Sequence, residues 1–366
     1  MKGATEVIGF GVFGYGFMAT AHLEALQGID GTRAVAVCGP RLERAQEVAA
    51  RFNAPLATRE PEELLDHPGV DAVIVDTPDV FHYELVMAAA KRGKHVFCEK
   101  PLSPDIEHAR EMAAAVERAG VRSMMGFSTR FSPVIQNVKR LLDAETLGRI
   151  FHVQAQAFNA GLLADPPRWS WRTDKARSGA GILGDLGAHL IDLNHFLLGP
   201  TAEVMASLQT FTPEVVDPAT GERHPHEVDD DTALLLRFAS DAHGTLALSR
   251  LGSVHMDYPI GRRHYLLDGS KGGLLWENGV ATVHPYKQPP YRLEGEPPLW
   301  EVDHHTFITG WARQNLAPFV EAIRQGVDRP PTLRDGLLAQ EVIEAALRSA
   351  RSGQWERVPP ATSPKS

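Results

Sequence analysis

Three side chains in this sequence are of types that can hold or move a proton near neutral pH. Asp185 and His189 lie four residues apart in a run with helical spacing, so both side chains would share one helix face. A histidine has an unperturbed pKa of about 6.5 and can accept a proton, while the carboxylate steers the imidazole or a substrate. Lys100 ends a short apolar run, and its ammonium group can hold an oxygen on which negative charge develops.

These residues also have less specific interpretations. Asp185, His189 and Asp192 share a helix face and could ligate a metal ion, but no further ligand pattern supports this, and we predict no metal site. Lys100 could be an exposed surface lysine, and His189 could be a hydrogen-bonded helix residue without a catalytic role. We expect His22, on the first predicted helix, to be structural.

Two overlapping glycine patterns near the start of the chain could bind a dinucleotide. Residues 9–14 fit G-x-G-x-x-G, and residues 14–19 fit the same pattern with alanine last. The motif requires a strand before it and a helix after it. The second pattern places an apolar strand at 6–13 and a helix from Phe17 to Gln27, whereas the first would bury glycines in the helix at about 1 kcal/mol each. We therefore predict the second register, with these residues at the cofactor: Gly14, Tyr15, Gly16, Phe17 and Met18.

Strand and helix signals alternate through the first 127 residues. Strands are expected at 34–38, 70–76, 95–99 and 122–127, and helices at 42–52, 81–92 and 104–119. This alternation is typical of a doubly wound parallel sheet, in which ligands bind at the carboxyl ends of the strands. Residues 1–127 are therefore predicted to form a Rossmann domain that binds NAD or NADP.

The end of the second predicted strand should select the cofactor. An NAD site usually offers a carboxylate there to the ribose 2′-hydroxyl, but this chain reads Cys38-Gly39-Pro40-Arg41. Gly39 leaves space, and the planar guanidinium of Arg41 can pair with a 2′-phosphate. The sequence favours NADP over NAD, with the alternative that Arg41 only begins the next helix.

Composition limits the class of protein. The chain has 366 residues and a formal net charge of −9, which favours two domains and argues against a nucleic-acid or anionic-membrane partner. No apolar run approaches the roughly 18 residues of a membrane span. The two cysteines, Cys38 and Cys98, cannot build a disulfide framework, and the first strand leaves no room for a signal peptide. We expect a cytoplasmic protein.

The remaining residues, 128–366, are predicted to form an α+β domain. Strand-like runs separated by polar turns indicate an antiparallel sheet, and a final helix is expected at 335–351; the runs are 150–158, 202–211, 232–238, 243–251 and 264–267. The segment 166–181 mixes aromatic side chains with cations and leads into the helix of Asp185. Aromatic stacking with hydrogen bonds is how proteins hold sugars, so we take Trp171, Arg172 and Arg130 as substrate candidates. The alternative is that the tryptophans only pack against the sheet.

Three longer stretches carry a more specific pattern. They are DTPDVFHYELVMAAAKRGKHVFCEKPLS at 76–103, GAGILGDLGAHLIDL at 179–193 and FVEAIRQGVDRPPTLRDGLLAQEVIEAALRSARSG at 319–353. Together with the glycine turn, they resemble the glucose–fructose oxidoreductase / inositol dehydrogenase (Gfo/Idh/MocA) family over essentially the whole chain. The resemblance implies a Rossmann domain followed by a domain built on a large open antiparallel sheet. It also implies a homodimer or homotetramer formed through that sheet.

The resemblance further implies an activity and roles for single residues. Similar proteins mostly oxidise or reduce sugars, inositol and related polyols with NAD(P), at a secondary alcohol or ketone. Lys100, Asp185 and His189 would be catalytic, with His189 the proton acceptor and a cis peptide bond after Lys100. Further cofactor contacts would be Thr77, Pro78, His82, Glu99 and Lys100, with the alternative that His82 only begins a helix.

Two departures and two other functions stay open. The acid after the second strand is missing, and alanine stands between Gly179 and Gly181 where three glycines are common. An NAD-dependent glycosidase that works by transient oxidation and elimination is the first alternative function. A non-catalytic cofactor-binding regulator is the second, although the presence of both Lys100 and His189 argues against it.

Overall fold

The computed structural model describes residues 7–253, 262–295 and 303–360, and the chain divides into two compact units. Unit 1 comprises residues 1–128 and 305–337, and unit 2 comprises 129–304 and 338–366. The domain boundary predicted from the sequence, between 127 and 128, lies one residue before the point where the chain first passes from unit 1 to unit 2. The predicted second domain included residues 305–337, whereas the structure places this segment in unit 1.

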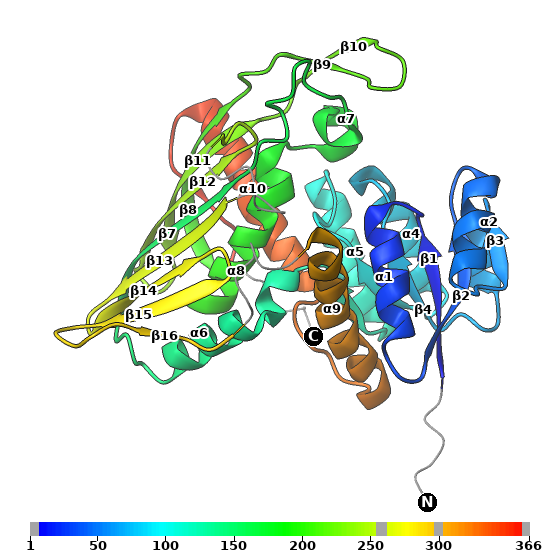
Figure 1. The fold of residues 1–366 in the computed structure, drawn as a ribbon, viewed down its shortest axis with the longest axis horizontal. Coiled ribbons are helices and arrows are strands. Elements are labelled where there is room, and N and C mark those ends of the chain that lie inside the picture. The colour runs from blue at the N-terminus through cyan, green and yellow to red at the C-terminus, as the bar shows by residue number, and fades with distance from the viewer. Residues whose placement is uncertain (1–6, 254–261, 296–302, 361–366) are drawn as a thin grey trace, which may run out of the picture. The chain divides into compact units, whose positions relative to one another are not determined.

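Unit 1 is a six-stranded parallel sheet with the strand order β3-β2-β1-β4-β5-β6 (Figure 1). Its strands are β1 (Ile8–Phe13), β2 (Thr32–Cys38), β3 (Leu56–Thr58), β4 (Ala72–Val75), β5 (His95–Cys98) and β6 (Ser123–Met125). Its helices are α1 (Phe17–Gln27), α2 (Leu42–Arg51), α3 (Pro61–Asp66), η1 (Asp79–Phe81), α4 (His82–Lys91), α5 (Ile106–Ala119) and most of α9 (His304–Gln325). The doubly wound sheet predicted from the alternation is confirmed, and β3 and α3 are additions to it.

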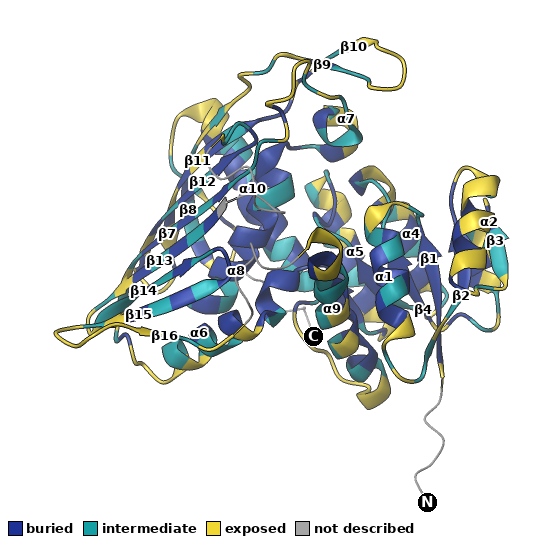
Figure 2. Ribbon diagram, in the orientation of Figure 1, coloured by how far each residue is buried: buried dark blue, intermediate teal, exposed yellow. Residues whose placement is uncertain are grey.

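The second glycine register is confirmed. Helix α1 begins at Phe17, and the preceding strand runs from Ile8 to Phe13. Val7 is described and lies outside the strand, and Glu6, where the predicted strand began, lies outside the described residues. Gly9 and Gly11 lie inside β1, where an added Cβ would come within 1.8 Å of the Gly69 carbonyl oxygen and 2.4 Å of a neighbouring leucine. The first pattern therefore reflects close packing around a buried strand (Figure 2).

Helix α9 joins unit 1 through its apolar face. Phe319 is fully buried, and its ring lies 6.3 Å from that of Phe10 on β1 and 6.0 Å from that of Phe97 on β5. Aromatic rings at these separations stabilise the contact beyond the area they bury. The periodicity of a helix shows that one face is apolar but not which sheet it covers, so the sequence did not assign α9 to this unit.

Unit 2 is built on a nine-stranded sheet with the order β16-β15-β14-β13-β7-β12-β11-β8-β17. Its strands in that sheet are β7 (Ile150–Phe158), β8 (Thr201–Gln209), β11 (Asp231–Phe238), β12 (His243–Ser249), β13 (Arg262–Gly269), β14 (Gly272–Glu277), β15 (Val280–Pro285), β16 (Tyr291–Arg292) and β17 (Glu356–Arg357). A separate hairpin joins β9 (Glu214–Val216) and β10 (Arg223–Pro225). The sheet is mostly antiparallel, as predicted, but β7 and β12 pair in parallel.

The helices of unit 2 are η2 (Ser128–Phe131), α6 (Pro133–Asp143), η3 (Trp171–Thr173), α7 (Lys175–Ser178), the π-helical turn η4 (Leu183–Gly187), α8 (Ala188–Leu198) and most of α10 (Leu333–Ser352). Helices α8 and α10 attach to the sheet through polar bonds. The Tyr265 hydroxyl of β13 donates to Asn194 of α8 at 2.8 Å, and the Ala206 N–H of β8 donates to Ser349 of α10 at 3.0 Å.

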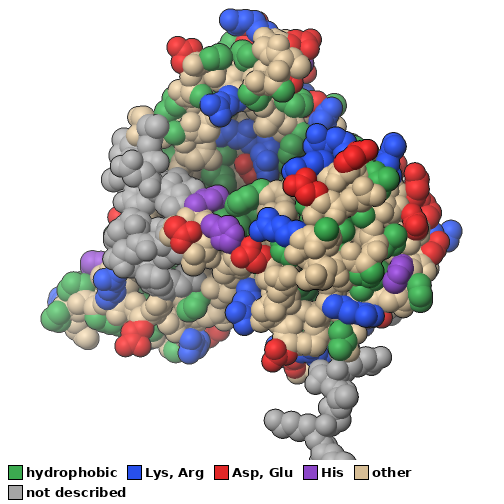
Figure 3. All heavy atoms as spheres, turned by 45° about the vertical axis from the view of Figure 1, so that its right-hand side comes forward, with side chains coloured by type: hydrophobic (Ala, Val, Ile, Leu, Met, Phe, Trp, Pro, Cys, Tyr) green, Lys and Arg blue, Asp and Glu red, His purple; other side chains and the backbone are tan. Residues whose placement is uncertain are grey.

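The sheet of unit 2 has one covered and one open face. Along β11, buried and exposed residues alternate strictly after the first position, with Leu234 and Leu236 buried and Leu235 47% exposed. Along β7, buried and intermediate residues alternate from Val153 to Phe158, and Figure 2 shows dark blue and teal mixed on the strands of this sheet. In the described part of the chain, no helix combines the length and apolarity needed to cross a membrane. On the side of the molecule drawn in Figure 3, acidic and basic side chains are interspersed on the visible surface.

Candidate functional site

The glycine turn of unit 1 leads into α1 at the carboxyl edge of the parallel sheet. Gly16 is the N-cap of α1 and supplies no side-chain cap, and the first turn of the helix carries no acidic residue. A Cβ added at Gly16 would meet nothing within 4 Å, so space lies open at the helix N-terminus. Because the N–H donors and the positive dipole end of a helix favour phosphate, the turn fits the pyrophosphate of a dinucleotide.

Gly14 has a structural reason to be glycine. Its φ of 111° lies in the region that side chains rarely adopt, and an added Cβ would stand 2.6 Å from the Asp76 carbonyl oxygen. In the sheet register, Phe13, Val75 and Cys98 are direct neighbours, so the residues that follow them emerge at one edge. The glycine turn, Asp76 and Glu99 therefore share this edge.

Tyr15 connects the turn to the residues expected to select the cofactor. A Cβ at Gly39 would lie 2.3 Å from the Tyr15 ring, so only glycine leaves room for it. The Tyr15 hydroxyl accepts a hydrogen bond from the Arg41 backbone N–H at 3.2 Å, and Arg41 Nε lies 3.4 Å from the same oxygen. Arg41 is also the N-cap residue of α2. Gly39 and Arg41 therefore both contact Tyr15.

The surroundings of β2 also carry negative charge. Burial and the nearby Glu60, Glu62 and Glu63 raise the pKa of the Cys38 thiol to about 12. These carboxylates follow β3, which pairs with β2. The end of β2, which Arg41 follows by three residues, therefore lies near three acids.

The loops after β4 and β5 hold Thr77, His82 and Lys100. His82 begins α4 and is fully buried; its Nδ1 lies 3.1 Å from the Pro101 carbonyl oxygen, and its Nε2 lies 3.0 Å from that of Thr77. Burial lowers the pKa of His82, against the effect of these carbonyl groups. The His82 ring therefore joins the loop after β4 to the loop after β5. This agrees with the alternative interpretation, in which His82 begins a helix. The Lys100–Pro101 peptide bond is cis, as the resemblance implied.

In unit 2, Asp185 and His189 lie in one short segment, on the π-helical turn η4 and the first turn of α8. Asp229, which the sequence did not single out, fixes the start of this segment. Its two carboxylate oxygens accept the N–H groups of Gly181 at 2.7 Å and Leu183 at 2.8 Å. It also accepts the Thr232 hydroxyl at 2.6 Å. A buried carboxylate therefore orients the residues that lead to Asp185.

Asp185 lies among arginines. Arg172 Nε is 3.7 Å from one of its oxygens, and Arg250 Nη2 is 3.4 Å from the other. Arg263 is buried, and burial lowers its pKa to about 10 although Asp185 acts in the opposite direction. The sequence had named Arg172 but neither Arg250, directly after β12, nor Arg263 on β13. These cations favour the ionised carboxylate at Asp185.

Arg130, a predicted substrate contact, is engaged within unit 2. Its guanidinium binds both carboxylate oxygens of Asp192, with Nε–H donating to Oδ2 at 2.7 Å, and both side chains are buried. Its charge also lies 5.3 Å from the Phe196 ring centroid. This arrangement gives Arg130 a structural function and occupies the oxygens with which Asp192 would have bound a metal.

Trp171 and Arg172 form η3, and the Arg172 guanidinium lies 4.3 Å from the Trp171 ring centroid. A capping box between Ser170 and Thr173 fixes this turn. Trp169 packs near His224 of β10 with ring centroids 5.5 Å apart. One tryptophan of the segment therefore packs against the hairpin, and the other is stacked with a cation that also faces Asp185.

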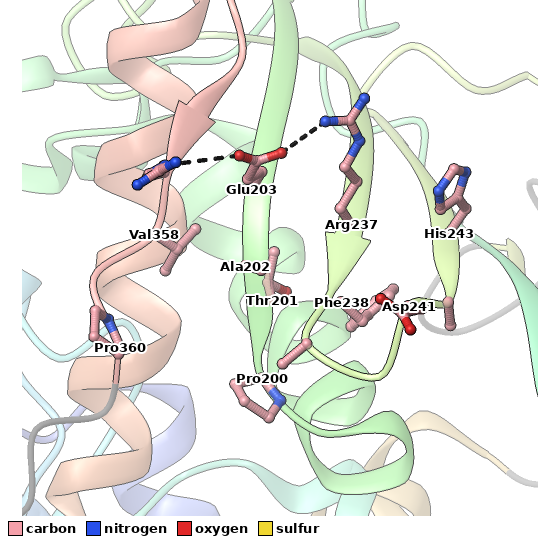
Figure 4. A pocket seen from close by; sticks show the side chains of 13 residues that line it. Pro200, Thr201, Ala202, Glu203, Arg237, Phe238, Asp241, His243, Val358 and Pro360 are labelled. Carbon is pink, nitrogen blue, oxygen red and sulfur yellow. Dashed lines mark hydrogen bonds and ion pairs between the residues drawn. The ribbon is translucent and has the colours of Figure 1, made fainter.

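A separate pocket of unit 2 contains none of the predicted site residues (Figure 4). It is lined by Thr201 at the start of β8, Phe238 at the end of β11 and His243 at the start of β12. Glu203 bridges Arg237 and Arg357 at its rim. Arg250 and Asp229 lie at the other ends of these strands, so the pocket is remote from Asp185.

Comparison with protein-family models gives two matches. Residues 8–127 match the oxidoreductase family model with an NAD-binding Rossmann fold (GFO_IDH_MocA), and residues 135–275 match the GFO/IDH/MocA C-terminal domain. The two matched segments fall in the parallel-sheet part of unit 1 and in the sheet of unit 2.

Curated relatives cover nearly the whole chain. Levoglucosan dehydrogenase of Pseudarthrobacter phenanthrenivorans is 28% identical, over 95% of this chain and 97% of that protein. An uncharacterized oxidoreductase of Synechocystis is 31% identical, over 95% of both. Inositol 2-dehydrogenase of Rhizobium meliloti is 28% identical, over 93% of this chain and 96% of that protein.

Solved structures agree with these matches. An oxidoreductase domain protein from Kribbella flavida is 30% identical with a TM-score of 0.88, over 97% of this chain and 100% of that chain. Levoglucosan dehydrogenase in complex with NADH is 25% identical with a TM-score of 0.89, over the same shares of the two chains.

Proposed function

The chain belongs to the GFO/IDH/MocA oxidoreductase family, and we propose that it is an NAD(P)-dependent dehydrogenase or reductase of a sugar, inositol or related polyol. The observation that carries the proposal is the edge of the parallel sheet in unit 1. An uncapped helix N-terminus behind a glycine turn lies there together with Lys100, which follows β5. Ligands of doubly wound sheets bind at this edge.

Unit 1 would hold the cofactor through backbone groups. Gly14 to Met18 present the N-terminus of α1 to the pyrophosphate, and the loop at Thr77 and Pro78 follows the neighbouring strand β4. His82 keeps this loop joined to the Lys100 loop, so it acts by positioning. When bound, the dinucleotide supplies the group that accepts or donates hydride.

The side chains of the chain would then manage the proton and the charge. Lys100 Nζ donates a hydrogen bond to the reacting oxygen and stabilises negative charge on it. His189 accepts the hydroxyl proton in the oxidation direction and returns it in reduction. Asp185, which lies between Arg172 and Arg250, orients the imidazole or a substrate hydroxyl. Trp171 offers a ring face, stacked with Arg172, for a sugar ring.

The substrate class is supported by the names of relatives. Levoglucosan dehydrogenase, inositol 2-dehydrogenase and myo-inositol 2-dehydrogenase act on sugar or cyclitol hydroxyl groups. The test is a panel of inositols, aldoses, ketoses and anhydrosugars with NAD and NADP, following absorbance of the reduced cofactor. Turnover of at least one polyol that is lost in Lys100→Met supports the proposal. Absence of turnover with every compound, despite cofactor binding, would contradict it.

The glycosidase and regulator alternatives receive no support from these relatives, whose names describe dehydrogenases and oxidoreductases. Aryl glycosides included in the same panel separate the first alternative. Release of the aglycone without net reduction of cofactor would favour it.

For the cofactor, we retain the proposal that NADP is accepted through Arg41. Gly39 stands directly after β2, where an NAD site usually offers a carboxylate to the ribose 2′-hydroxyl, and the Tyr15 ring fills the space beside it. Arg41 is hydrogen-bonded to Tyr15. The planar guanidinium of Arg41 is the group that would pair with the 2′-phosphate. Equal steady-state constants for NADP in wild type and Arg41→Ala would contradict this.

A homodimer or homotetramer through the open face of the unit 2 sheet belongs to the same proposal. Leu235 on that face is 47% exposed and pairs in register with Met205 of β8 and Thr245 of β12. Apolar side chains gathered on an exposed sheet are typical of an interface. Light scattering of wild type and Leu235→Glu tests this, since the variant should be monomeric.

Cytoplasmic residence also stays a proposal, supported by two unpaired cysteines.

A further inference from the structure

Three ionisable side chains meet inside unit 1, behind the edge that carries the glycine turn and Lys100. His22 comes from α1, Asp76 follows β4, and Glu99 follows β5. His22 Nδ1 lies 2.9 Å from Asp76 Oδ2, and His22 Nε2 lies 3.8 Å from Glu99 Oε1. The side chains of His22 and Asp76 are 0% exposed, and that of Glu99 is 12% exposed.

The cluster leaves polar atoms that need compensation. Within the described residues, His22 Nε2 and Asp76 Oδ1 are buried and make no hydrogen bond. A single imidazole thus lies between two carboxylates in a space of low polarity. Burying a charge costs little only when it is paired, so two ionised carboxylates around a neutral imidazole would be strongly unfavourable. A proton on the imidazole turns the arrangement into one cation between two acids.

Each member of the cluster is joined to a residue assigned to the cofactor or substrate. The backbone of Asp76 packs against Gly14, where a Cβ would come within 2.6 Å of its carbonyl oxygen. Glu99 Oε2 accepts the backbone N–H of Lys100 at 3.2 Å. His22 lies on α1 itself, the helix whose N-terminus faces the pyrophosphate position. Movement of the cluster would therefore move both the glycine turn and the start of the Lys100 loop.

The space for the cluster is built into the fold. A Cβ at Gly126, next to β6, would lie 2.6 Å from a Glu99 oxygen, so glycine makes room for that carboxylate. The Phe97 ring packs edge-on to the His22 ring with centroids 4.9 Å apart. Apolar packing on one side and the close approach of Gly126 on another leave the His22 ring fully buried.

We propose that a protonated His22 bridges Asp76 and Glu99, and that it acts as a positioning residue that holds the glycine turn and the Lys100 loop in the geometry that binds the dinucleotide. This rests on the proposed function for the identity of the ligand. His22 does not touch substrate or cofactor in this account. It acts through Asp76 and Glu99.

The charges that face His22 give the direction of its pH dependence. Burial alone would lower the pKa of His22, but Asp76, and more weakly Glu99, raise it above its ordinary value. Burial and Asp76 raise the pKa of Glu99, against His22 and Lys100. Burial and the same carboxylates raise the pKa of the neighbouring Cys98 thiol, which stays neutral. Because the pKa of His22 is raised on folding, its contribution is present below about pH 6.5 and is lost as pH rises through the higher folded value.

The experiment measures two quantities against pH, the dissociation constant of NADH by fluorescence and the unfolding midpoint of the protein without cofactor. The variants are His22→Asn, Glu99→Gln and their combination. Asparagine can still donate to Asp76 but carries no charge, and glutamine still accepts the Lys100 N–H. In wild type, both quantities should worsen as pH rises above about 6.5. His22→Asn should weaken NADH binding at least about tenfold near pH 6 and remove this part of the pH dependence.

The double variant separates charge from shape. If charge is what matters, His22→Asn/Glu99→Gln should bind NADH more tightly than His22→Asn alone, because one of the two buried carboxylates is then neutral and Asp76 keeps a hydrogen-bond donor in the asparagine. His95→Asn at the other end of β5, whose ring accepts the Arg122 N–H, is the control. Because burial lowers the pKa of His95, its own contribution changes only below about pH 6.5, and the variant should keep the wild-type loss as pH rises above that value.

Failure of this inference can be told from failure of the proposed function. Wild-type binding and stability in His22→Asn, or no recovery in the double variant, would overturn the bridge. One tightly held metal ion per chain, whose removal abolishes the stability of the cluster, would also overturn it. A protein that binds neither NADH nor NADPH would refute the proposed function, while the unfolding profile without cofactor would still test the bridge.

Discussion

Replacing Asp229 with alanine should loosen the segment that carries Asp185 and His189. The substitution removes the acceptor for two backbone N–H groups, those of Gly181 and Leu183, in a place where Asp229 is only 5% exposed. A hydrogen bond to a charged group contributes about 1.5–3 kcal/mol, so losing the two backbone bonds, with the bond from the Thr232 hydroxyl in addition, gives a destabilisation of at least about 4 kcal/mol. For a unit of this size, that corresponds to a fall in the unfolding midpoint of about 10 °C.

Function should suffer at temperatures where the variant is folded. A displacement of about 1 Å at reacting groups can cost about 100-fold in rate, so we expect kcat of Asp229→Ala to fall at least about tenfold. The effect on NADH affinity should be small, because Asp229 belongs to unit 2 and the glycine turn to unit 1. Asp229→Asn keeps one acceptor and should lose about half as much stability.

Tryptophan fluorescence during urea unfolding is the suitable assay. Trp169, Trp171, Trp276 and Trp355 belong to unit 2 and Trp311 to unit 1, so most of the signal follows the unit that contains the substitution. The matched control is Asp217→Ala, which removes a carboxylate that accepts one N–H, from Ala219, in an exposed turn. Stability of Asp229→Ala within about 1 kcal/mol of Asp217→Ala would refute the reasoning.

Three further substitutions test other parts of the account. Lys100→Met should lower kcat by about 100- to 1000-fold with at most a threefold change in NADH affinity, in steady-state and binding assays; a change confined to affinity would argue against its proposed role. Arg41→Ala should raise the KM for NADP about tenfold and leave that for NAD nearly unchanged, so an equal effect on both would count against a phosphate contact. Asp192→Ala should destabilise unit 2 by about 3–5 kcal/mol in urea unfolding, because it leaves the buried Arg130 guanidinium without its carboxylate. A loss of substrate affinity without a loss of stability would instead indicate that Arg130 contacts the substrate.

The sequence predicted the dinucleotide turn well because the evidence for it is local. A strand, two glycines and a helix lie next to one another in the chain, and the cost of glycine inside a helix decided between the two registers. The buried strands of the parallel sheet were also predicted, since both of their faces are apolar. Strand β3 has three residues, too few for a pattern.

Residues that act through distant partners could not be found in this way. Asp229 lies in an acidic run before β11 that reads as an ordinary loop, and only the fold brings it to Gly181. His22 was taken as structural, and nothing in the sequence joins it to Asp76 and Glu99, which are 54 and 77 positions further on. The buried partner of Arg130 could not be found from the sequence either, because Asp192 lies 62 residues away; the substrate contact of Arg130 stays a prediction.

The most direct test of the central claim is a structure of the complex with reduced cofactor and a polyol identified by the panel. The account predicts that Lys100 Nζ and a ring nitrogen of His189 both lie within about 3 Å of the same substrate oxygen, next to the nicotinamide. A complex in which the two side chains contact different regions of the ligand, with the reacting carbon beside neither, would contradict it.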